Sequence, residues 1–319
     1  MNTLYPLLLT PVPREVLWGG NRLKEHYGKR APFARIAESW ELSVRKDAMS
    51  TIANGVCRGM SLEDYIAENG CGVVSETYTG DRFPLLIKFI DACDRLSIQV
   101  HPDDAYGLTH EGELGKTEMW YIVEADEGAQ LVYGLKEGIT AADFADAVRR
   151  GCIGDTLRYV DVHAGETYFI PSGQVHAIGA GILIAEIQQN SNVTYRVYDY
   201  DRRQADGTLR QLHTDKALDV VKIRTDAELN ALRFAASRCD DGELAACSYF
   251  RVRKTDGRDL CLPATDSFLS LLCTDGTGEI LCEGERYPIR RGDSYFIPRG
   301  CAECTLTGSA VVLISEVTG

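Results

Sequence analysis

Two histidines, a glutamate and a glutamine lie where strands are expected, and together they could hold a metal ion. Gln99 and His101 are two residues apart in the stretch SIQVHPDD, so they share one face of a strand. Glu118 begins the apolar run EMWYIV, and His176 follows a Pro-Ser-Gly turn after another strand. Two neutral imidazoles and one carboxylate form the ligand set of a catalytic divalent-metal site with an open position. Gln99 either adds a weak carbonyl ligand or only hydrogen-bonds to a group that the metal holds.

The composition limits the partners of such a site. The chain has 319 residues, of which 45% are hydrophobic and 25% charged, so a folded protein with more than one packed unit is expected. Its formal charge of −13 argues against nucleic acid or an anionic membrane as the main partner. A small anion still fits if a few cationic side chains converge, and Lys116, two positions before Glu118, is one candidate.

Localisation and redox state follow from what the sequence contains. The N-terminal stretch MNTLYPLLLTPVPREV has a short apolar run, broken by prolines, and lacks the basic start of an export signal, so a cytoplasmic location is expected.

The eleven cysteines are scattered, which favours reduced thiols. Cys301 and Cys304 form one C-x-x-C pair, and a single pair of this kind is weak support for zinc.

Short β-rich runs between Gly, Pro and Asp residues must position the candidate ligands. Their density predicts sandwiches or barrels. The expected strands lie in the runs PLLIKFIDA, RLSIQV, MWYIVEA, ETYFIPSG, ILIAEIQQ, VTYRVYDY, SFLSLLC, GEILCEG, DSYFIPRG and AVVLISEV. Helical patterns are confined to 61–70, 140–151 and 214–222, where Ser61 is the expected cap of the first helix.

An internal repeat indicates two copies of one β module. The segment VHAGETYFIP at 162–171 returns 127 positions later as IRRGDSYFIP at 289–298. After the proline the copies diverge, and His176 aligns with Glu303. Only the first module therefore keeps a histidine at this position, and only that module follows a strand with His101.

The motifs resemble those of the cupin superfamily. Gly165, Pro171, Gly173 and His176 match the second cupin motif except at its last position, where Ala180 replaces the usual Asn. The stretch SIQVHPDD resembles the first motif with Gln99 in place of its first histidine. Longer segments are similar to one family in particular, the type I mannose-6-phosphate isomerases in their short bacterial form. These segments are ESWELS, LSIQVHPDD, GKTEMWYI and IPSGQVHAIGAGILIAEIQQNSNVTYRVYDYDR, and the resemblance runs from about residue 5 to the C-terminus.

The resemblance implies a mainly β fold of two cupin (jelly-roll) β-barrels with a few peripheral helices. Residues 1–235 are expected to form the catalytic metal-binding domain with N-terminal strands and small helices, and 236–319 a degenerate C-terminal cupin domain. The implied activity is the zinc-dependent interconversion of mannose 6-phosphate and fructose 6-phosphate through a cis-enediol. One Zn²⁺ per chain is implied, held by His101, Glu118 and His176, with Gln99 as the glutamine that some members use.

The resemblance also suggests residues that act on the substrate, a small sugar phosphate. Arg196 matches the catalytic arginine, and Lys116 and Glu186 fall where members have residues proposed to act on substrate. Either Glu186 or Lys116 could transfer the proton, and Lys116 could instead anchor phosphate or a sugar hydroxyl. Arg196 suits stabilisation of enediolate charge or phosphate binding, unless Asp199 or Asp201 merely neutralises it.

Two other classes of function remain open at this point. Two imidazoles and a carboxylate also suit a ferrous dioxygenase, which would consume dioxygen. A cupin fold alone is equally compatible with a non-catalytic sugar-binding protein. The oligomeric state and the phosphate-binding residues do not follow from the sequence.

Overall fold

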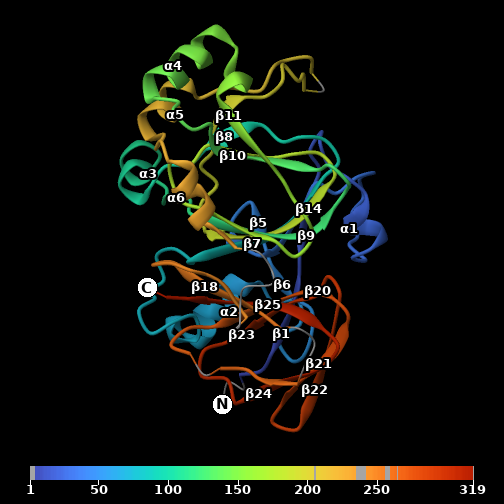
Figure 1. Cartoon of the computed structure of the whole chain (residues 1–319). Coiled ribbons are helices and arrows are strands. Elements are labelled where there is room, and N and C mark those ends of the chain that lie inside the picture. The colour runs from blue at the N-terminus through green and yellow to red at the C-terminus, as the bar shows by residue number, and fades with distance from the viewer. Residues whose placement is uncertain (1–3, 205, 235–241, 256–258, 264, 319) are drawn as a thin grey trace. The chain divides into compact units, whose positions relative to one another are not determined.

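The computed structural model describes residues 4–204, 206–234, 242–255, 259–263 and 265–318, which group into two compact units (Figure 1). Unit 1 lies within 1–14, 22–89 and 237–319, and unit 2 within 15–21 and 90–236. The segment 237–319 thus shares a unit with N-terminal residues, and the division after residue 235 stays a prediction. Each helix in the described part of the chain is too short or too polar to cross a lipid bilayer.

Unit 2 holds two antiparallel sheets. The first has the strand order β11-β10-β13-β8-β15, and the second contains the order β16-β12-β9-β14. The strands are β8 (Ile98–Val100), β9 (Glu118–Ala125), β10 (Gln130–Leu135), β11 (Leu157–Asp161), β12 (Thr167–Ile170), β13 (His176–Ile178), β14 (Ile182–Gln189), β15 (Tyr195–Tyr198) and β16 (Arg233–Phe234). All six strands predicted from the sequence between residues 84 and 200 are present, five of them here.

Helices α4 and α5 cover one face of the five-stranded sheet in unit 2 (Figure 1). Phe144 of α4 and Ala217 of α5 pack on Ile98 and Val100 of β8 in one apolar cluster. Because side chains alternate along a strand, Gln99 lies on the opposite face. The helices of unit 2 are α3 (Asp104–His110), α4 (Ala141–Arg150), α5 (Thr214–Val220), α6 (Asp226–Ala231) and the 3₁₀ turn η2 (Ile153–Thr156).

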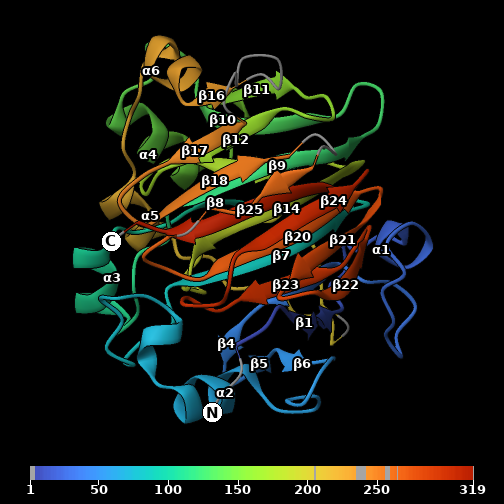
Figure 2. The same ribbon diagram turned by 90° about the horizontal axis from the view of Figure 1, so that it is seen from below.

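Unit 1 is a sandwich of two antiparallel sheets with the orders β17-β18-β25-β20-β23-β1-β6 and β19-β24-β21-β22 (Figure 2). Leu271, Ile280 and Leu306, from β20, β21 and β24, are buried in one cluster between them. The strands are β1 (Leu7–Thr10), β6 (Thr51–Ile52), β17 (Glu243–Ala246), β18 (Phe250–Lys254), β19 (Leu260–Cys261), β20 (Leu269–Asp275), β21 (Thr277–Cys282), β22 (Glu285–Arg290), β23 (Ser294–Ile297), β24 (Cys304–Gly308) and β25 (Val311–Val317). The four strands predicted after residue 266 are all present.

The remaining elements of unit 1 are short, apart from β7. They are β2 (Val12–Arg14), α1 (Arg22–Glu25), β3 (Glu38–Leu42), β4 (Val44–Arg45), β5 (Ala48–Met49), α2 (Leu62–Asn69), η1 (Cys71–Val73) and β7 (Leu85–Ala92), whose last residues enter unit 2. Ser61 caps α2 by accepting a hydrogen bond from the Asp64 backbone N–H, as the sequence predicts. The predicted helices at 140–151 and 214–222 correspond to α4 and α5, and α4 has a complete capping box.

The repeat found in the sequence has the same local structure in both units. Gly165 and Gly292 take φ values of 91° and 90°, a region that L side chains rarely adopt. The hydroxyl oxygens of Tyr168 and Tyr295 lie 3.5 and 2.7 Å from the backbone carbonyl oxygen seven residues earlier. This shared local geometry agrees with the repeat in the sequence. The mainly β class is confirmed. A closed barrel is not found among the described strands, so the two jelly-roll barrels stay a prediction.

Candidate metal centre

The five-stranded sheet of unit 2 aligns three polar side chains across neighbouring strands. His176 of β13 is the register partner of Gln99 on β8, and Gln99 is the partner of Arg196 on β15. Residues directly opposite in antiparallel strands point to the same face. Since α4 and α5 cover the other face, these three side chains belong to the face turned away from the helices. His101 follows the last residue of β8 and lies two positions after Gln99.

The second sheet of unit 2 aligns the acidic residues. On β9, Glu118 and Trp120 share one face, and their partners on β14 are Gln188 and Glu186. Trp120 donates its indole N–H to Glu186 Oε2 at 2.9 Å, which fixes that carboxylate. Glu118 is the first residue of β9, as the sequence predicts.

The ligand atoms of His101, Glu118 and His176 all lie within 4.8 Å of one another. His101 Nε2 is 3.7 Å from Glu118 Oε2, and His176 Nε2 is 3.5 Å from Glu118 Oε1. The three residues are at most 1% exposed. A buried cluster of two imidazole nitrogens and one carboxylate matches the donors of a catalytic zinc or iron site.

Backbone carbonyls set the tautomer of both imidazoles. His101 donates its Nδ1 proton to Val193 O at 2.9 Å, and His176 donates its Nδ1 proton to Gln174 O at 2.8 Å. A carbonyl oxygen can only accept, so Nε2 of each ring keeps its lone pair. Burial lowers the pKa of His176 to about 3, so this ring is neutral. Gln99 Nε2 lies 3.2 Å from His176 Nε2, at the edge of the cluster.

Lys116 lies between the two buried carboxylates. Its Nζ is 2.7 Å from Glu118 Oε2, 3.8 Å from Glu186 Oε1 and 3.4 Å from His101 Nε2. Lys116 is 5% exposed and Glu186 2% exposed. Both candidates for proton transfer therefore lie beside the ligand cluster.

Arg196 belongs to a group of three arginines around one carboxylate. Asp199 pairs with Arg202 and lies 3.5 Å from Arg210 Nη1, whereas Arg196 donates to the backbone oxygen of Gln211 at 2.8 Å. Burial, followed by the charge of Arg210, lowers the pKa of Arg196 to about 10, so it remains charged at neutral pH. Asp199 is thus engaged by Arg202 and Arg210. Neither Arg202 nor Arg210 stands out in the sequence alone.

The acidic pair after His101 has a structural role. Asp103 caps α3 by accepting the Tyr106 backbone N–H at 3.1 Å. Asp104 accepts the Gly115 backbone N–H at 2.8 Å and the Gln189 amide at 2.9 Å. Neither aspartate orients His101, because its Nδ1 hydrogen-bonds to the Val193 carbonyl.

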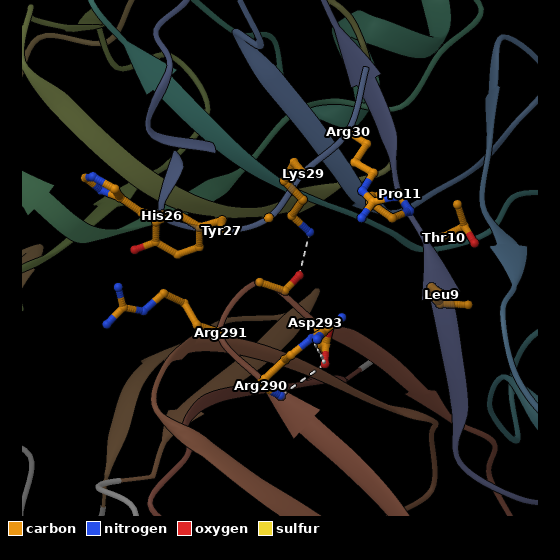
Figure 3. A pocket seen from close by; sticks show the side chains of 12 residues that line it. Leu9, Thr10, Pro11, His26, Tyr27, Lys29, Arg30, Arg290, Arg291 and Asp293 are labelled. Carbon is orange, nitrogen blue, oxygen red and sulfur yellow. Dashed lines mark hydrogen bonds and ion pairs between the residues drawn. The ribbon is translucent and has the colours of Figure 1, made fainter. Parts of the chain in front are cut away.

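A basic pocket of about 540 Å³ lies within unit 1 (Figure 3). Lys29, Arg30, Arg290 and Arg291 are among its lining residues, together with Asp293. Lys29 Nζ donates a hydrogen bond to the backbone carbonyl of Gly292. In Figure 3 the Lys29 side chain points toward the segment that contains Arg290 and Asp293. This pocket shares no residue with the His–Glu–His cluster. The sequence did not reveal it, because its lining segments are more than 250 residues apart in the chain.

Antiparallel sheets with a buried His–Glu–His cluster that could hold a metal ion are typical of a protein of the cupin type. Two family models match this chain: the catalytic domain of type I phosphomannose isomerase over residues 7–127, and the cupin domain of mannose-6-phosphate isomerase over 240–317. Mannose-6-phosphate isomerase ManA of Bacillus subtilis is 37% identical over 99% of this chain and 100% of its own length. A mannose-6-phosphate isomerase of Streptococcus mutans is 36% identical, with 98% of each chain covered.

Solved structures agree with this similarity. The mannose 6-phosphate isomerase from Bacillus subtilis matches with a TM-score of 0.87 and 33% identity, covering 98% of this chain and 99% of its own. A phosphomannose isomerase mutant from Salmonella typhimurium matches with a TM-score of 0.77 over 98% of this chain and all of its own, and at 16% identity it supports the fold alone. The chain belongs to the type I phosphomannose isomerase family.

Proposed function

We propose that this protein interconverts mannose 6-phosphate and fructose 6-phosphate through a cis-enediol, with one zinc ion per chain. The convergence of His101 Nε2 and His176 Nε2 on the Glu118 carboxylate carries the proposal. Support for this substrate comes from full-length relatives that are named mannose-6-phosphate isomerases. A small sugar phosphate is the only partner that the proposal requires, and a cytoplasmic location remains a prediction.

His101, Glu118 and His176 would hold the metal, and Gln99 would supply a weak fourth donor if its amide oxygen turns toward the cluster. The donor set fits zinc because Nδ1 carries the proton in both rings, which makes each Nε2 a lone-pair donor, and the carboxylate lies between the two Nε2 atoms. Bound zinc would act as a Lewis acid that stabilises developing negative charge on the sugar oxygens.

The contacts favour Glu186 as the proton-transfer group and Lys116 as a fixed cation. Isomerisation moves a proton between two neighbouring carbons, so one group must accept and return it. Lys116 Nζ lies 2.7 Å from Glu118 Oε2 and 3.8 Å from Glu186 Oε1, and this pairing with two carboxylates suits a fixed cation. Glu186 is held through Oε2 by Trp120, and its carboxylate is a suitable base.

Arg196 would stabilise enediolate charge from the face that it shares with Gln99 and His176. The phosphate would be drawn to the group formed by Arg196, Arg202 and Arg210. Asp199 offsets only part of this positive charge. A guanidinium binds phosphate through paired N–H donors, which makes arginine well suited to this role.

The proposal includes two cupin barrels, of which only the first is catalytic. The shared turn geometry of the two modules supports a duplicated β module. At the position of His176, the second module has Glu303. We assign that module a scaffold role in isomerisation.

The test is turnover of fructose 6-phosphate before and after metal removal. Purified protein should form mannose 6-phosphate, a chelator should abolish the activity, and added zinc should restore it. Activity that survives complete metal removal would refute the assigned site. Dioxygen uptake with ferrous ion and no isomerisation would support a dioxygenase instead, and sugar binding without turnover in metal-loaded protein would support a non-catalytic role.

A further inference from the structure

Three cysteine side chains converge within unit 1, at one end of the β21–β24 strand pair. Cys282 is the last residue of β21, and Cys304 is the first residue of β24, its direct register partner. Cys301 lies in the turn before β24, where its backbone N–H donates to Pro298 O at 3.1 Å. The sequence showed only the C-x-x-C pair. Antiparallel pairing of β21 with β24 supplies the third thiol.

The sulfur atoms are spaced as ligands of one ion would be. Cys282 Sγ and Cys301 Sγ are 3.7 Å apart, and all three sulfurs lie within 4.8 Å of one another. A tetrahedral zinc site with Zn–S bonds of about 2.3 Å separates its sulfur atoms by about 3.8 Å. A disulfide would use two of the sulfurs and leave the third without a role. Three converging thiols therefore fit a metal better than one covalent bond.

The surroundings of the cluster suit a soft metal. Cys282 and Cys304 are each 3% exposed and pack among apolar residues of the sandwich, including Leu262 and Leu306. Cys301 is half-buried, so solvent and a metal ion can reach the three sulfur atoms from the side of Cys301. A single buried cysteine is usually a small apolar residue, but that explanation does not require three sulfurs to meet.

We propose that Cys282, Cys301 and Cys304 form a thiolate site for a thiophilic metal ion of the zinc class. Sulfur ligands select such ions over magnesium, calcium or manganese. The thiols release their protons to solvent on binding, and water or an external thiol completes the coordination on the Cys301 side. The bound ion links the end of β21 to the turn before β24. This proposed metal site is separate from the one proposed for isomerisation, because the cysteine cluster and the His–Glu–His cluster share no residue.

Cobalt titration of the reduced full-length protein tests the site. Cobalt bound to thiolates gives an intense charge-transfer absorption, whereas cobalt at the His–Glu–His cluster does not. Wild type should bind one equivalent at each site, show the thiolate band, and lose the band when zinc is added. Cys301→Ser should lose the band and one equivalent, while His176→Ala should keep the band and lose the other equivalent.

Cys247→Ser is the matched control, because Cys247 is a half-buried thiol of the same unit outside the cluster. It should keep the full band. Cys301 is half-buried, so its serine variant should fold, and circular dichroism checks this. Absence of the band in reduced wild type, an unchanged band in Cys301→Ser, or equal loss in Cys247→Ser would overturn the proposal. A Cys282–Cys301 disulfide in freshly purified protein that takes up no cobalt after reduction would do the same.

Discussion

His101 and His176 present their Nε2 atoms to opposite oxygens of one carboxylate, at 3.7 and 3.5 Å. Their rings lie 4.7 Å apart, centroid to centroid, and each is anchored through Nδ1 to a backbone carbonyl. Backbone anchors do not depend on side-chain rotamers, so the two lone pairs are held in place by the fold itself. The affinity for a metal held by these rings would therefore depend on the path of the loops that contain Gln174 and Val193.

Metal binding and turnover should separate in a pair of variants. His176→Ala removes a proposed ligand. Losing a residue that only hydrogen-bonds to a ligand typically lowers metal affinity by about 10- to 100-fold, so zinc affinity should fall by more than this. Arg196→Ala should retain zinc but lower kcat by about 100- to 1,000-fold, the range for removing one charge-stabilising donor. Zinc content and kcat of both variants check this.

His163→Ala is the control for the histidine variant, because the His163 side chain is 76% exposed and lies outside the cluster. It should keep both zinc and activity. Equal zinc loss in Arg196→Ala and His176→Ala would make Arg196 a structural residue.

Glu186→Gln and Lys116→Met should distinguish the base from the cation. Glu186→Gln keeps an acceptor for Trp120 but cannot take a proton, so kcat should fall by about 10²- to 10⁴-fold. Exchange of the transferred proton with deuterated solvent should stop in the same variant. Lys116→Met should lower kcat yet retain exchange in the molecules that turn over. The reverse pattern, with exchange lost only in Lys116→Met, would assign the base to Lys116.

The strands and the ligand types were predictable because both follow local rules. Alternation placed Gln99 opposite the apolar face of β8, and the start of the apolar run EMWYIV placed Glu118 at the first residue of β9. Helix α3 was missed, because HPDD also fits a turn and Gly107 weakens the helical pattern. His101, expected on the same strand as Gln99, instead follows the last residue of that strand, Val100.

Features built from distant segments were not predictable in the same way. Arg202 and Arg210 look like ordinary surface charges until the loop after β15 folds back and brings both to Asp199. The third thiol of the cysteine cluster depends on the register of β21 against β24. No local sequence pattern predicts such contacts between distant residues, because they form only when the whole sheet is in place.

The buried pair of Lys29 and Glu41 should be costly to break. Their side chains are 7% and 0% exposed, and Lys29 Nζ lies 2.6 Å from Glu41 Oε2. Lys29→Met leaves a buried carboxylate without its cation, so the free energy of unfolding should fall by about 3–5 kcal/mol. The double variant Lys29→Met, Glu41→Met removes both charges and should recover most of this loss. Urea unfolding of the three proteins measures it, and a double variant no more stable than Lys29→Met would contradict the idea.

Glu111 at the end of α3 should make stability depend on acid pH. Its Oε1 accepts hydrogen bonds from Lys216 Nζ at 2.6 Å and the Tyr195 hydroxyl at 2.9 Å, linking α3 to α5 and β15. The hydrogen bond from Lys216 is the main cause that lowers the pKa of Glu111 below its ordinary 4.5. A carboxyl group whose pKa is lower in the folded than in the unfolded protein stabilises the fold at pH values above its unfolded-state pKa. This stabilisation is lost as the pH falls through the folded-state pKa.

Wild type should therefore exceed Glu111→Gln in urea midpoint at neutral pH, and the difference should shrink as the pH is lowered below 4.5. Glutamine keeps an acceptor for Tyr195, so the variant isolates the charge. Glu127→Gln, at an exposed turn, is the control and should give a smaller difference at neutral pH. A difference between wild type and Glu111→Gln that stays constant down the acid range would show that the carboxylate acts only as a hydrogen-bond acceptor.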